Sequence, residues 1–145
     1  IAKLNAVKGS VAAATALTRA TILARNNLTD GVTCAGGGGF ANNLNTGAGT
    51  LCTEAGVIAM VNGYPDVTAI GTAGLLSAAG LTTTFNPTSA ELNANGYNYT
   101  STGTVATFQI QGAPTPATCQ FTYTEAAAGA APVISAITPA TTAGC

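Results

Sequence analysis

Apolar side chains recur every three or four positions over the first 26 residues, and this stretch contains no proline. Such spacing places the apolar side chains on one face of an α-helix. Turn-forming residues follow at Asn26-Asn27 and Asp30-Gly31. The pattern therefore predicts a helix from Ile1 to about Asn26. Because Ile1 is not a helix-capping residue type, we expect the chain to enter this helix part-way along. The predicted packing face consists of Leu4, Val7, Val11, Ala14, Thr18 and Ile22.

The periodicity changes to two after Asn86-Pro87. In three segments, aromatic, aliphatic or cysteine side chains alternate with Thr, Asn or Gln, which is the pattern of half-buried antiparallel strands. We interpret their tyrosines as packing residues rather than as a platform for sugars. Residues 132–139 are a candidate edge strand. The alternating side chains are Tyr97 and Tyr99; Ala106, Phe108 and Ile110; and Cys119, Phe121 and Tyr123.

The segment between the predicted helix and these strands has weaker patterns. Residues 34–52 are rich in Gly and Asn, which favours an exposed surface loop. Residues 57–61 form a short β-prone apolar run, and the turn-forming residues 62–65 follow it. These features predict one strand and one tight turn in this part of the chain.

A short second helix is predicted over residues 67–80, with Asp66 placed to cap it. Gly71 and Gly74 weaken this helix, because glycine is a poor helix former. Taken together, the patterns predict an α+β fold in which a long N-terminal helix packs on an antiparallel sheet of three to five strands. The length of 145 residues suits a single domain, residues 1–145.

Charged residues make up only 6% of the chain: four Lys and Arg and five Asp and Glu, giving a net charge of −1. Nucleic-acid binding requires a cluster of cations, so we expect no nucleic-acid partner. The chain has no His, which removes the commonest general base and metal ligand. The four cations fall in the predicted helix, where we expect them to keep its outer face solvated. They are Lys3, Lys8, Arg19 and Arg25.

Five carboxylates are the remaining candidates for catalysis or metal binding: Asp30, Glu54, Asp66, Glu91 and Glu125. Neighbouring members of this set are at least 12 residues apart, and no acidic loop of the calcium-binding type is present. We therefore expect no catalytic residue, no metal site and no cofactor. A single cleft containing Glu54, Glu91 and Glu125 would instead indicate a hydrolase.

The four cysteines are Cys34, Cys52, Cys119 and Cys145. They include no C-x-x-C pair, and a zinc site has no His to complete it. An even number of cysteines in a small, weakly charged chain predicts two disulfides formed in an oxidising compartment. Three pairings are possible. We favour Cys34 with Cys52 and Cys119 with Cys145, because sequential pairing closes loops in the two regions with the least regular structure.

The order of these features resembles the globular half of a type IV pilin: a helix entered part-way, a Gly/Asn-rich loop, an antiparallel meander and a disulfide-bounded C-terminus. Residues 1–14 look like the second half of the pilin N-terminal helix. Residues 61–65 and 119–124 are similar to segments of the mannose-sensitive haemagglutinin type of pilins. The resemblance covers most of the chain, and the loop between Cys34 and Cys52 matches least.

This resemblance implies a truncated, soluble ectodomain of a structural subunit. Its partners would be identical subunits in a helical filament and the pilus assembly machinery of the inner membrane, and it would reach the membrane only through a missing apolar N-terminal helix. The filament would be a fimbrium on the surface of a Gram-negative bacterium, serving attachment, motility or contact. The alternatives are a minor pilin, a type II secretion pseudopilin or a secreted carbohydrate-binding adhesin module.

Overall fold

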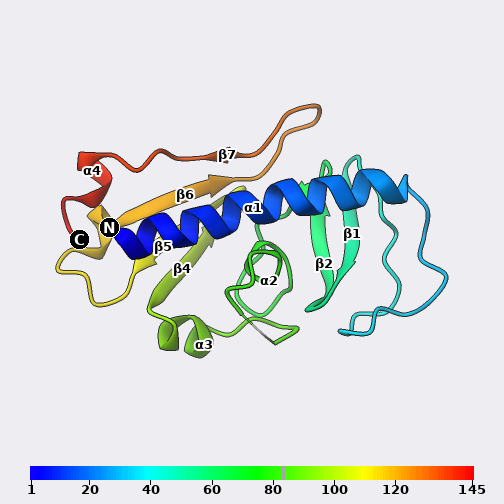
Figure 1. Ribbon diagram of the computed structural model, residues 1–145, viewed down its shortest axis with the longest axis horizontal. Coiled ribbons are helices and arrows are strands. Elements are labelled where there is room, and N and C mark those ends of the chain that lie inside the picture. Colours follow the sequence, from blue (N-terminus) through cyan, green and yellow to red (C-terminus); the bar gives the residue numbers. More distant parts are fainter. Residues whose placement is uncertain (83) are drawn as a thin grey trace.

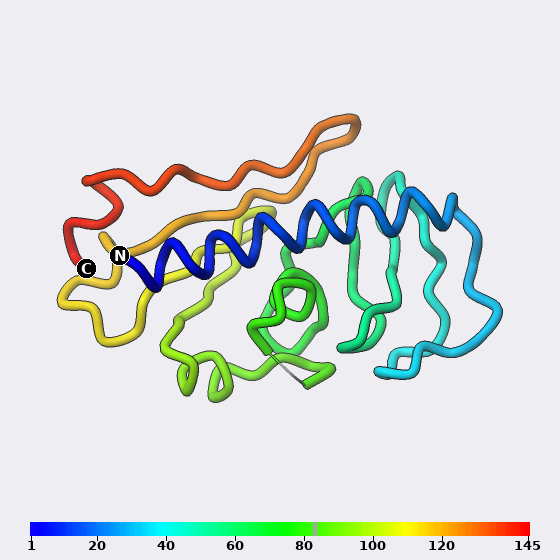
Figure 2. The backbone as a smooth tube through the Cα atoms, in the orientation of Figure 1, coloured from blue at the N-terminus to red at the C-terminus, as the bar shows by residue number. Residues whose placement is uncertain are grey.

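A computed structural model of the chain describes residues 1–82 and 84–145. A long helix runs along the longest axis of the molecule, and the remaining elements lie along it (Figure 1). The N- and C-termini lie at the same end (Figure 2). The elements in chain order are α1 (Ala2–Arg25), β1 (Ala48–Thr53), β2 (Gly56–Val61), β3 (Tyr64–Pro65), α2 (Leu75–Ala78), α3 (Ser89–Ala94), β4 (Tyr97–Thr102), β5 (Val105–Ile110), the 3₁₀ turn η1 (Pro116–Thr118), β6 (Gln120–Thr124), β7 (Val133–Ile134) and α4 (Pro139–Thr142).

The predicted N-terminal helix is present as α1, within one residue of its expected bounds at either end. Leu4, Val7, Val11 and Ile22 are at most 1% exposed, and Ala14, Thr15 and Thr18 complete the buried stripe. The helix ends because Asn26 adopts a left-handed conformation with φ of 49°, and its N–H donates to the Ile22 carbonyl. The periodic apolar positions thus form the face through which α1 packs.

The predicted meander is present as β4, β5 and β6, with β7 added at the edge. All pairs in this four-stranded sheet are antiparallel. Phe108 stands opposite both Tyr99 and Phe121, so one aromatic layer crosses three strands. The Phe108 and Phe121 rings are stacked with centroids 5.0 Å apart. The candidate edge strand is shorter than expected, because only Val133–Ile134 pairs as a strand.

The expectation of a single sheet is wrong, because the structure has two. The second sheet has the order β1-β2-β3, also antiparallel. β2 matches the predicted β-prone run, whereas β1 lies inside the segment expected to be loop. Leu51 of β1 is 1% exposed and stands opposite Ile58 of β2, so tertiary packing favours a strand despite the Gly- and Thr-rich composition.

The loop that follows α1 is not entirely an exposed excursion. Ala41 and Asn43 have no exposed surface. The Asn43 side-chain amide donates to the Leu28 carbonyl at 2.6 Å and to the Asp30 carboxylate at 2.7 Å. These bonds fold the loop back towards the end of α1.

The predicted second helix is reduced to one turn, Leu75–Ala78, and Asp66 does not cap it. Two glycines explain the difference. Gly71 has φ of 100°, which interrupts a helix. A Cβ on Gly74 would lie 2.5 Å from the Thr68 hydroxyl oxygen, so the backbone here packs more closely than a larger residue allows.

The short helix α3 was not predicted. Its N-cap is Thr88, whose hydroxyl oxygen accepts the Glu91 N–H at 3.3 Å. The final turn, α4, was also not predicted, and Thr138 caps it in a reciprocal arrangement with Thr141. Both helices are too short to show an apolar period.

Two apolar clusters fill the molecule, and α1 contributes to both. The larger cluster lies between the N-terminal part of α1 and the four-stranded sheet, and it includes Leu4, Val7, Val11, Leu75, Leu76, Leu92, Phe108, Phe121 and Tyr123. The smaller cluster lies at the other end of the helix, where Ile22 packs with Leu51, Ile58, Met60 and Ala73. The long helix therefore joins the two sheets.

The structure contains two disulfides, as predicted. They join the pairs favoured by the sequence, Cys34 with Cys52 and Cys119 with Cys145, with Cα–Cα distances of 5.6 and 4.8 Å. The first holds the Gly-rich loop against β1, and the second holds the C-terminus beside the start of β6. None of the described helices combines the length and the apolar character needed to cross a bilayer.

Candidate functional site

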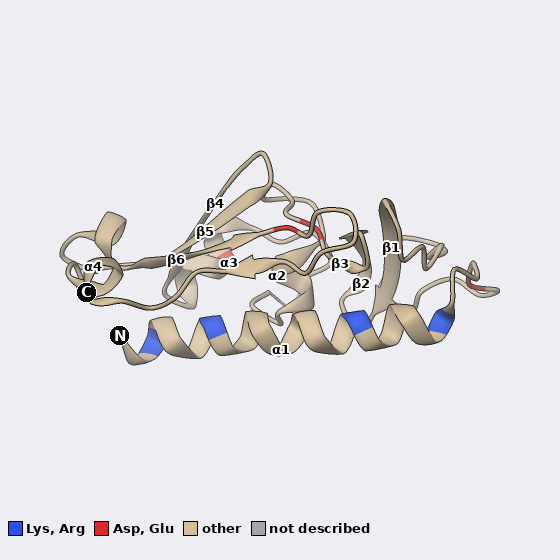
Figure 3. Ribbon diagram, turned by 90° about the horizontal axis from the view of Figure 1, so that it is seen from above, with Lys and Arg blue, Asp and Glu red and all other residues tan. Residues whose placement is uncertain are grey.

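One face of α1 is left uncovered along its whole length. Figure 3 shows the rest of the molecule lying on the opposite side of this helix. Most of the exposed side chains are small, and Leu17 and Leu23 are 70% and 46% exposed. The face consists of Ala2, Asn5, Ala6, Gly9, Ser10, Ala12, Ala13, Ala16, Leu17, Ala20, Leu23 and Ala24. We call it the bare face of α1. A surface of this kind lets another backbone approach closely.

The cations do not solvate the bare face as expected, because three of them contact the rest of the molecule. The Lys3 ammonium lies 5.0 Å from the centre of the Tyr97 ring. The Arg19 guanidinium donates to the Asn62 carbonyl at 3.3 Å and lies 4.8 Å from the centre of the Tyr64 ring.

Arg25 donates to the Cys52 carbonyl at 3.3 Å. With Lys3 and Arg19, it lies along the flanks of the packed stripe, so these three side chains hold α1 against the sheets. Lys3 is nevertheless exposed and Lys8 is partly exposed, so both keep charge at the edges of the bare face.

Asp66 and Glu125 form a carboxyl pair between the two sheets. The Val67 N–H donates to the Glu125 carboxylate at 3.1 Å. Burial, together with the hydrogen bond and charge of Glu125, raises the pKa of Asp66 from 3.8 to about 7, against an opposing backbone hydrogen bond from Val67. Asp66 therefore keeps a proton to nearly neutral pH and shares it with Glu125.

Two buried tyrosines extend this polar centre. The Tyr99 hydroxyl donates to the Thr68 carbonyl, and the Tyr123 hydroxyl donates to the Pro65 carbonyl, both at 2.7 Å. Burial, with the nearby negative charges, raises the pKa of Tyr99 to about 12 and raises the pKa of Tyr123 as well. These tyrosines tie the four-stranded sheet to β3 and to the segment after it, and neither offers an exposed ring to a sugar.

The remaining carboxylates have separate surroundings. Glu91 is beside Thr84, whose hydroxyl donates to it at 2.9 Å, whereas Asp30 accepts from Asn43. Glu54 lies at the β1–β2 turn, lining a cavity that neither Glu91 nor Glu125 lines. Asp66 and Glu125 contact one another although they lie far apart in the chain, so no sequence motif indicates this contact.

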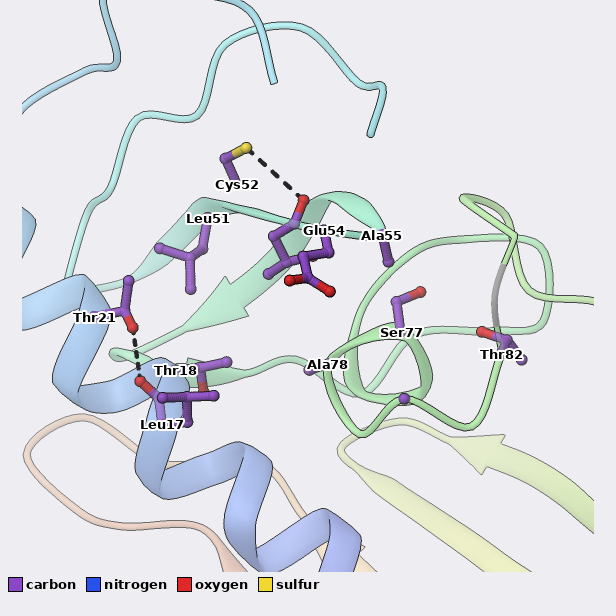
Figure 4. A pocket seen from close by; sticks show the side chains of 12 residues that line it. Leu17, Thr18, Thr21, Leu51, Cys52, Glu54, Ala55, Ser77, Ala78 and Thr82 are labelled. Carbon is purple, nitrogen blue, oxygen red and sulfur yellow. Dashed lines mark hydrogen bonds between the residues drawn. The ribbon is translucent and has the colours of Figure 1, made fainter. Parts of the chain in front are cut away.

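A cavity of about 660 Å³ lies between α1, the β1–β2 hairpin and α2 (Figure 4). Its walls are mainly apolar and hydroxyl-bearing, and Glu54 is the one charged side chain among the described residues that line it. The Ser77 and Thr82 hydroxyl oxygens are buried beside it and have no hydrogen-bond partner within the described chain. No set of three or more acidic, Cys or His side chains suited to a metal is found among the described residues. The lining includes Leu17, Thr18, Thr21, Leu51, Glu54 and Ala78.

The chain matches no protein-family model, no curated protein and no solved structure. The molecule's own surfaces are therefore the basis for assigning a function. Three features described above are candidate binding sites: the bare face of α1, the carboxyl pair and the cavity. Of these, the bare face is by far the most extended.

Proposed function

We propose that this protein is a structural subunit that polymerises into a filament of the type IV pilus class, with the bare face of α1 as its main contact surface. The observation that carries the proposal is the asymmetry of α1. One side of this 24-residue helix is buried on two sheets, while the other presents alanine, glycine and two exposed leucines to solvent. An uncovered face of small side chains along a 24-residue helix suits close packing against the helix of a neighbouring subunit.

The charge distribution supports polymerisation of identical copies. A net charge of −1 gives little repulsion between stacked subunits. Small side chains on the bare face allow the helices of neighbouring subunits to approach closely. The two disulfides suit a subunit that works outside the cytoplasm, where thiols oxidise.

In this proposal the partners are identical subunits and the assembly machinery of the inner membrane, and the filament lies on the cell surface. Anchoring before assembly falls to an apolar helical segment encoded ahead of Ile1. The carboxyl pair and the disulfides have structural roles, and no residue has a catalytic one.

The first test is the sequence encoded by the thirty or so codons before Ile1. The proposal expects a short basic leader, then Phe and an unbroken apolar stretch with one early Glu. A conventional secretory signal peptide in that place would contradict it and favour a free exported binding module. This test assumes nothing about the fold.

A second test probes the bare face directly. Ala13→Arg places a large charge at the middle of this face, and because Ala13 is exposed we expect normal folding. Ala127→Arg is the matched control, since Ala127 is also an exposed alanine but lies in the loop after β6. Electron microscopy of filaments from the complete gene should show loss of filaments in the first variant and normal filaments in the second. If the two variants assembled equally well, the bare face of α1 would not be part of the filament interface.

A further inference from the structure

The charged side chains divide into those with a partner inside the molecule and two without. Seven of the nine contact a ring, a carbonyl, a hydroxyl, an amide or another carboxyl group. These seven are Lys3, Arg19, Arg25, Asp30, Asp66, Glu91 and Glu125. Within the described chain, Lys8 and Glu54 make no hydrogen bond, ion pair or ring contact. One unpartnered cation and one unpartnered anion therefore remain.

Glu54 is part of the cavity between α1, the β1–β2 hairpin and α2. In Figure 4, its side chain lies between the β1–β2 hairpin and the helical turn that carries Ser77 and Ala78. Leu17 and Leu51 supply apolar wall, and Leu17 is 70% exposed. The volume of about 660 Å³ is within the range of pockets that hold a ligand or a large side chain.

Two buried hydroxyl groups beside this cavity also lack a hydrogen-bond partner in the described chain. Ser77 and Thr82 are 6% and 4% exposed, and their oxygens lack a partner in the described part of the chain. A buried polar atom without a hydrogen bond is costly, and a bound group is one way to satisfy it. Both oxygens are covered in this structure, but rotation of the Ser77 side chain between staggered positions would turn its hydroxyl without moving the backbone.

A lysine side chain meets these requirements. Its four methylene groups can lie along Leu17 and Leu51, and its ammonium has three donors and no acceptor. The carboxylate of Glu54 takes one donor and neutralises the charge, and the Ser77 hydroxyl can accept another. An anionic or purely apolar group would leave Glu54 unpaired in the complex.

Lys8 of the same molecule cannot fill this cavity. Lys8 and Leu17 are nine positions apart on α1, or about two and a half helical turns, so they point to opposite sides of the helix. The donor and the acceptor therefore lie on opposite flanks of one molecule. A contact between two different patches is heterologous, and repeating it produces an open filament or a ring rather than a closed dimer.

We propose that Lys8 of one copy inserts into the cavity of a second copy and pairs with Glu54. This contact rests on the proposed filament function and names one lateral contact within it. Lys3 is already placed over Tyr97, so Lys8 is the lysine left for this role.

Carbodiimide cross-linking tests the contact, because the reagent joins a lysine to a carboxylate only when the two are paired closely. Equal amounts of unlabelled and ¹⁵N-labelled chain are mixed at high concentration and cross-linked, and the joined peptides are read by mass spectrometry. We expect a peptide joining Lys8 to Glu54 in which one half is ¹⁵N-labelled and the other is unlabelled, and a ladder of species beyond the dimer. Lys8→Gln and Glu54→Gln each remove one of the two reacting groups, so each should abolish this product and the ladder that depends on it. Both positions are at the surface, so thermal unfolding should match the wild type.

Mixing the two variants tests the heterologous arrangement. Neither Lys8→Gln nor Glu54→Gln can make the contact with itself, but the lysine of the second can enter the cavity of the first. The mixture should therefore give the Lys8–Glu54 product in dimers only, without the longer ladder. Lys8→Arg is a further control, because it keeps the charge but does not form the amide bond.

Several outcomes would overturn the contact. These are cross-links that join Glu54 to Lys3 or to the N-terminal amine, a Lys8–Glu54 product within one copy, or no cross-linked product from the wild type at any concentration. Each of these leaves the filament proposal standing, because that proposal is decided by the sequence encoded before Ile1 and by the Ala13→Arg variant.

Discussion

At the scale of single residues, the charge of Asp66 is the clearest case of an environment that changes a side chain's chemistry. Its carboxyl group is partly buried beside Glu125, so ionising both would place two negative charges together. The folded protein avoids this by retaining one proton. The same proton supplies a hydrogen bond between the β3–α2 connection and the end of β6.

This proton makes stability depend on pH. The pKa of Asp66 is raised from an ordinary value of 3.8 to about 7, so between these values the folded state binds a proton that the unfolded state has lost. The free energy of unfolding should therefore be highest near pH 4 and fall until about pH 7, then level off. Asp66→Asn should flatten this profile and exceed the wild type in stability at about pH 8, because an amide donates to Glu125 without titrating. Urea unfolding across this pH range measures both effects.

Asp30→Asn is the control, since the Asp30 carboxylate accepts from Asn43 and has no carboxyl neighbour among its hydrogen-bond partners. It should leave the slope between pH 4 and pH 7 in place. If wild type and Asp66→Asn had parallel profiles, the shared proton would be ruled out.

Buried hydroxyl groups fall into two kinds, and their removal should separate them. The Tyr123 hydroxyl donates to the Pro65 carbonyl, whereas the Ser77 hydroxyl has no partner in the described chain. Tyr123→Phe should lower the free energy of unfolding by about 1 kcal/mol, because it removes a buried hydrogen bond. Ser77→Ala should leave it unchanged or raise it. Denaturant titration of both variants decides the matter, and a clear loss in Ser77→Ala would reveal a hydrogen bond at this hydroxyl.

At the scale of elements, predictability followed the length and regularity of the pattern. α1 was predictable because its buried positions recur over 24 residues, and β5 and β6 were predictable because apolar and polar residues alternate strictly. β1 was missed because its sequence is dominated by small residues, and only pairing with β2 reveals it. α3 carried a detectable signal, Thr88 followed three residues later by Glu91, but its single turn and a half shows no period.

The candidate sites were less predictable than the fold, for a physical reason. The helical period locates the outer face of α1, and seven of the twelve bare-face positions are alanine. The expectation that the cations solvate this face was wrong, because three of them contact the rest of the molecule. The Asp66–Glu125 pair and the cavity depend on how the two sheets are placed by α1. That placement comes from contacts between residues far apart in the chain, which neither spacing nor composition records.

The turn between β2 and β3 shows how one element limits a single residue. Asn62 and Gly63 have φ angles of 50° and 81°, which suit a tight hairpin turn. A Cβ on Gly63 would also meet the Arg19 guanidinium. Gly63→Ala should therefore lower the free energy of unfolding by more than about 1 kcal/mol and displace Arg19 from the Tyr64 ring.

Gly112 provides a matched control for this effect. Its φ is 80°, almost the same as that of Gly63, but a Cβ there would meet nothing within 4 Å. Gly112→Ala should show the backbone strain alone. The difference between the two variants in chemical denaturation then measures the displacement of Arg19, and equal losses would mean that Arg19 moves aside freely.

At the scale of the whole molecule, α1 and a few polar contacts bind two sheets into one unit. The Asn62 side-chain amide donates to the Ala126 carbonyl at 2.9 Å, which joins the β2–β3 turn to the end of β6. The two disulfides lie outside this junction, one beside β1 and one at the C-terminus. Each disulfide thus restrains a peripheral segment, while the connection between the sheets depends on non-covalent packing along the helix.

A continuous helix that is buried at both ends should couple the two apolar clusters, and this can be measured. Leu4 packs in the larger cluster and Ile22 in the smaller, and neither has exposed surface. Leu4→Ala and Ile22→Ala should each lower the free energy of unfolding by about 2 to 5 kcal/mol. If the helix transmits the loss, amide hydrogen exchange will accelerate in both sheets in both variants. Leu23→Ala, at an exposed position, should change neither quantity.

Faster exchange confined to β1 and β2 in Ile22→Ala would show instead that the sheets unfold separately. A subunit whose helix forms the filament contact would then lack a rigid connection between its ends.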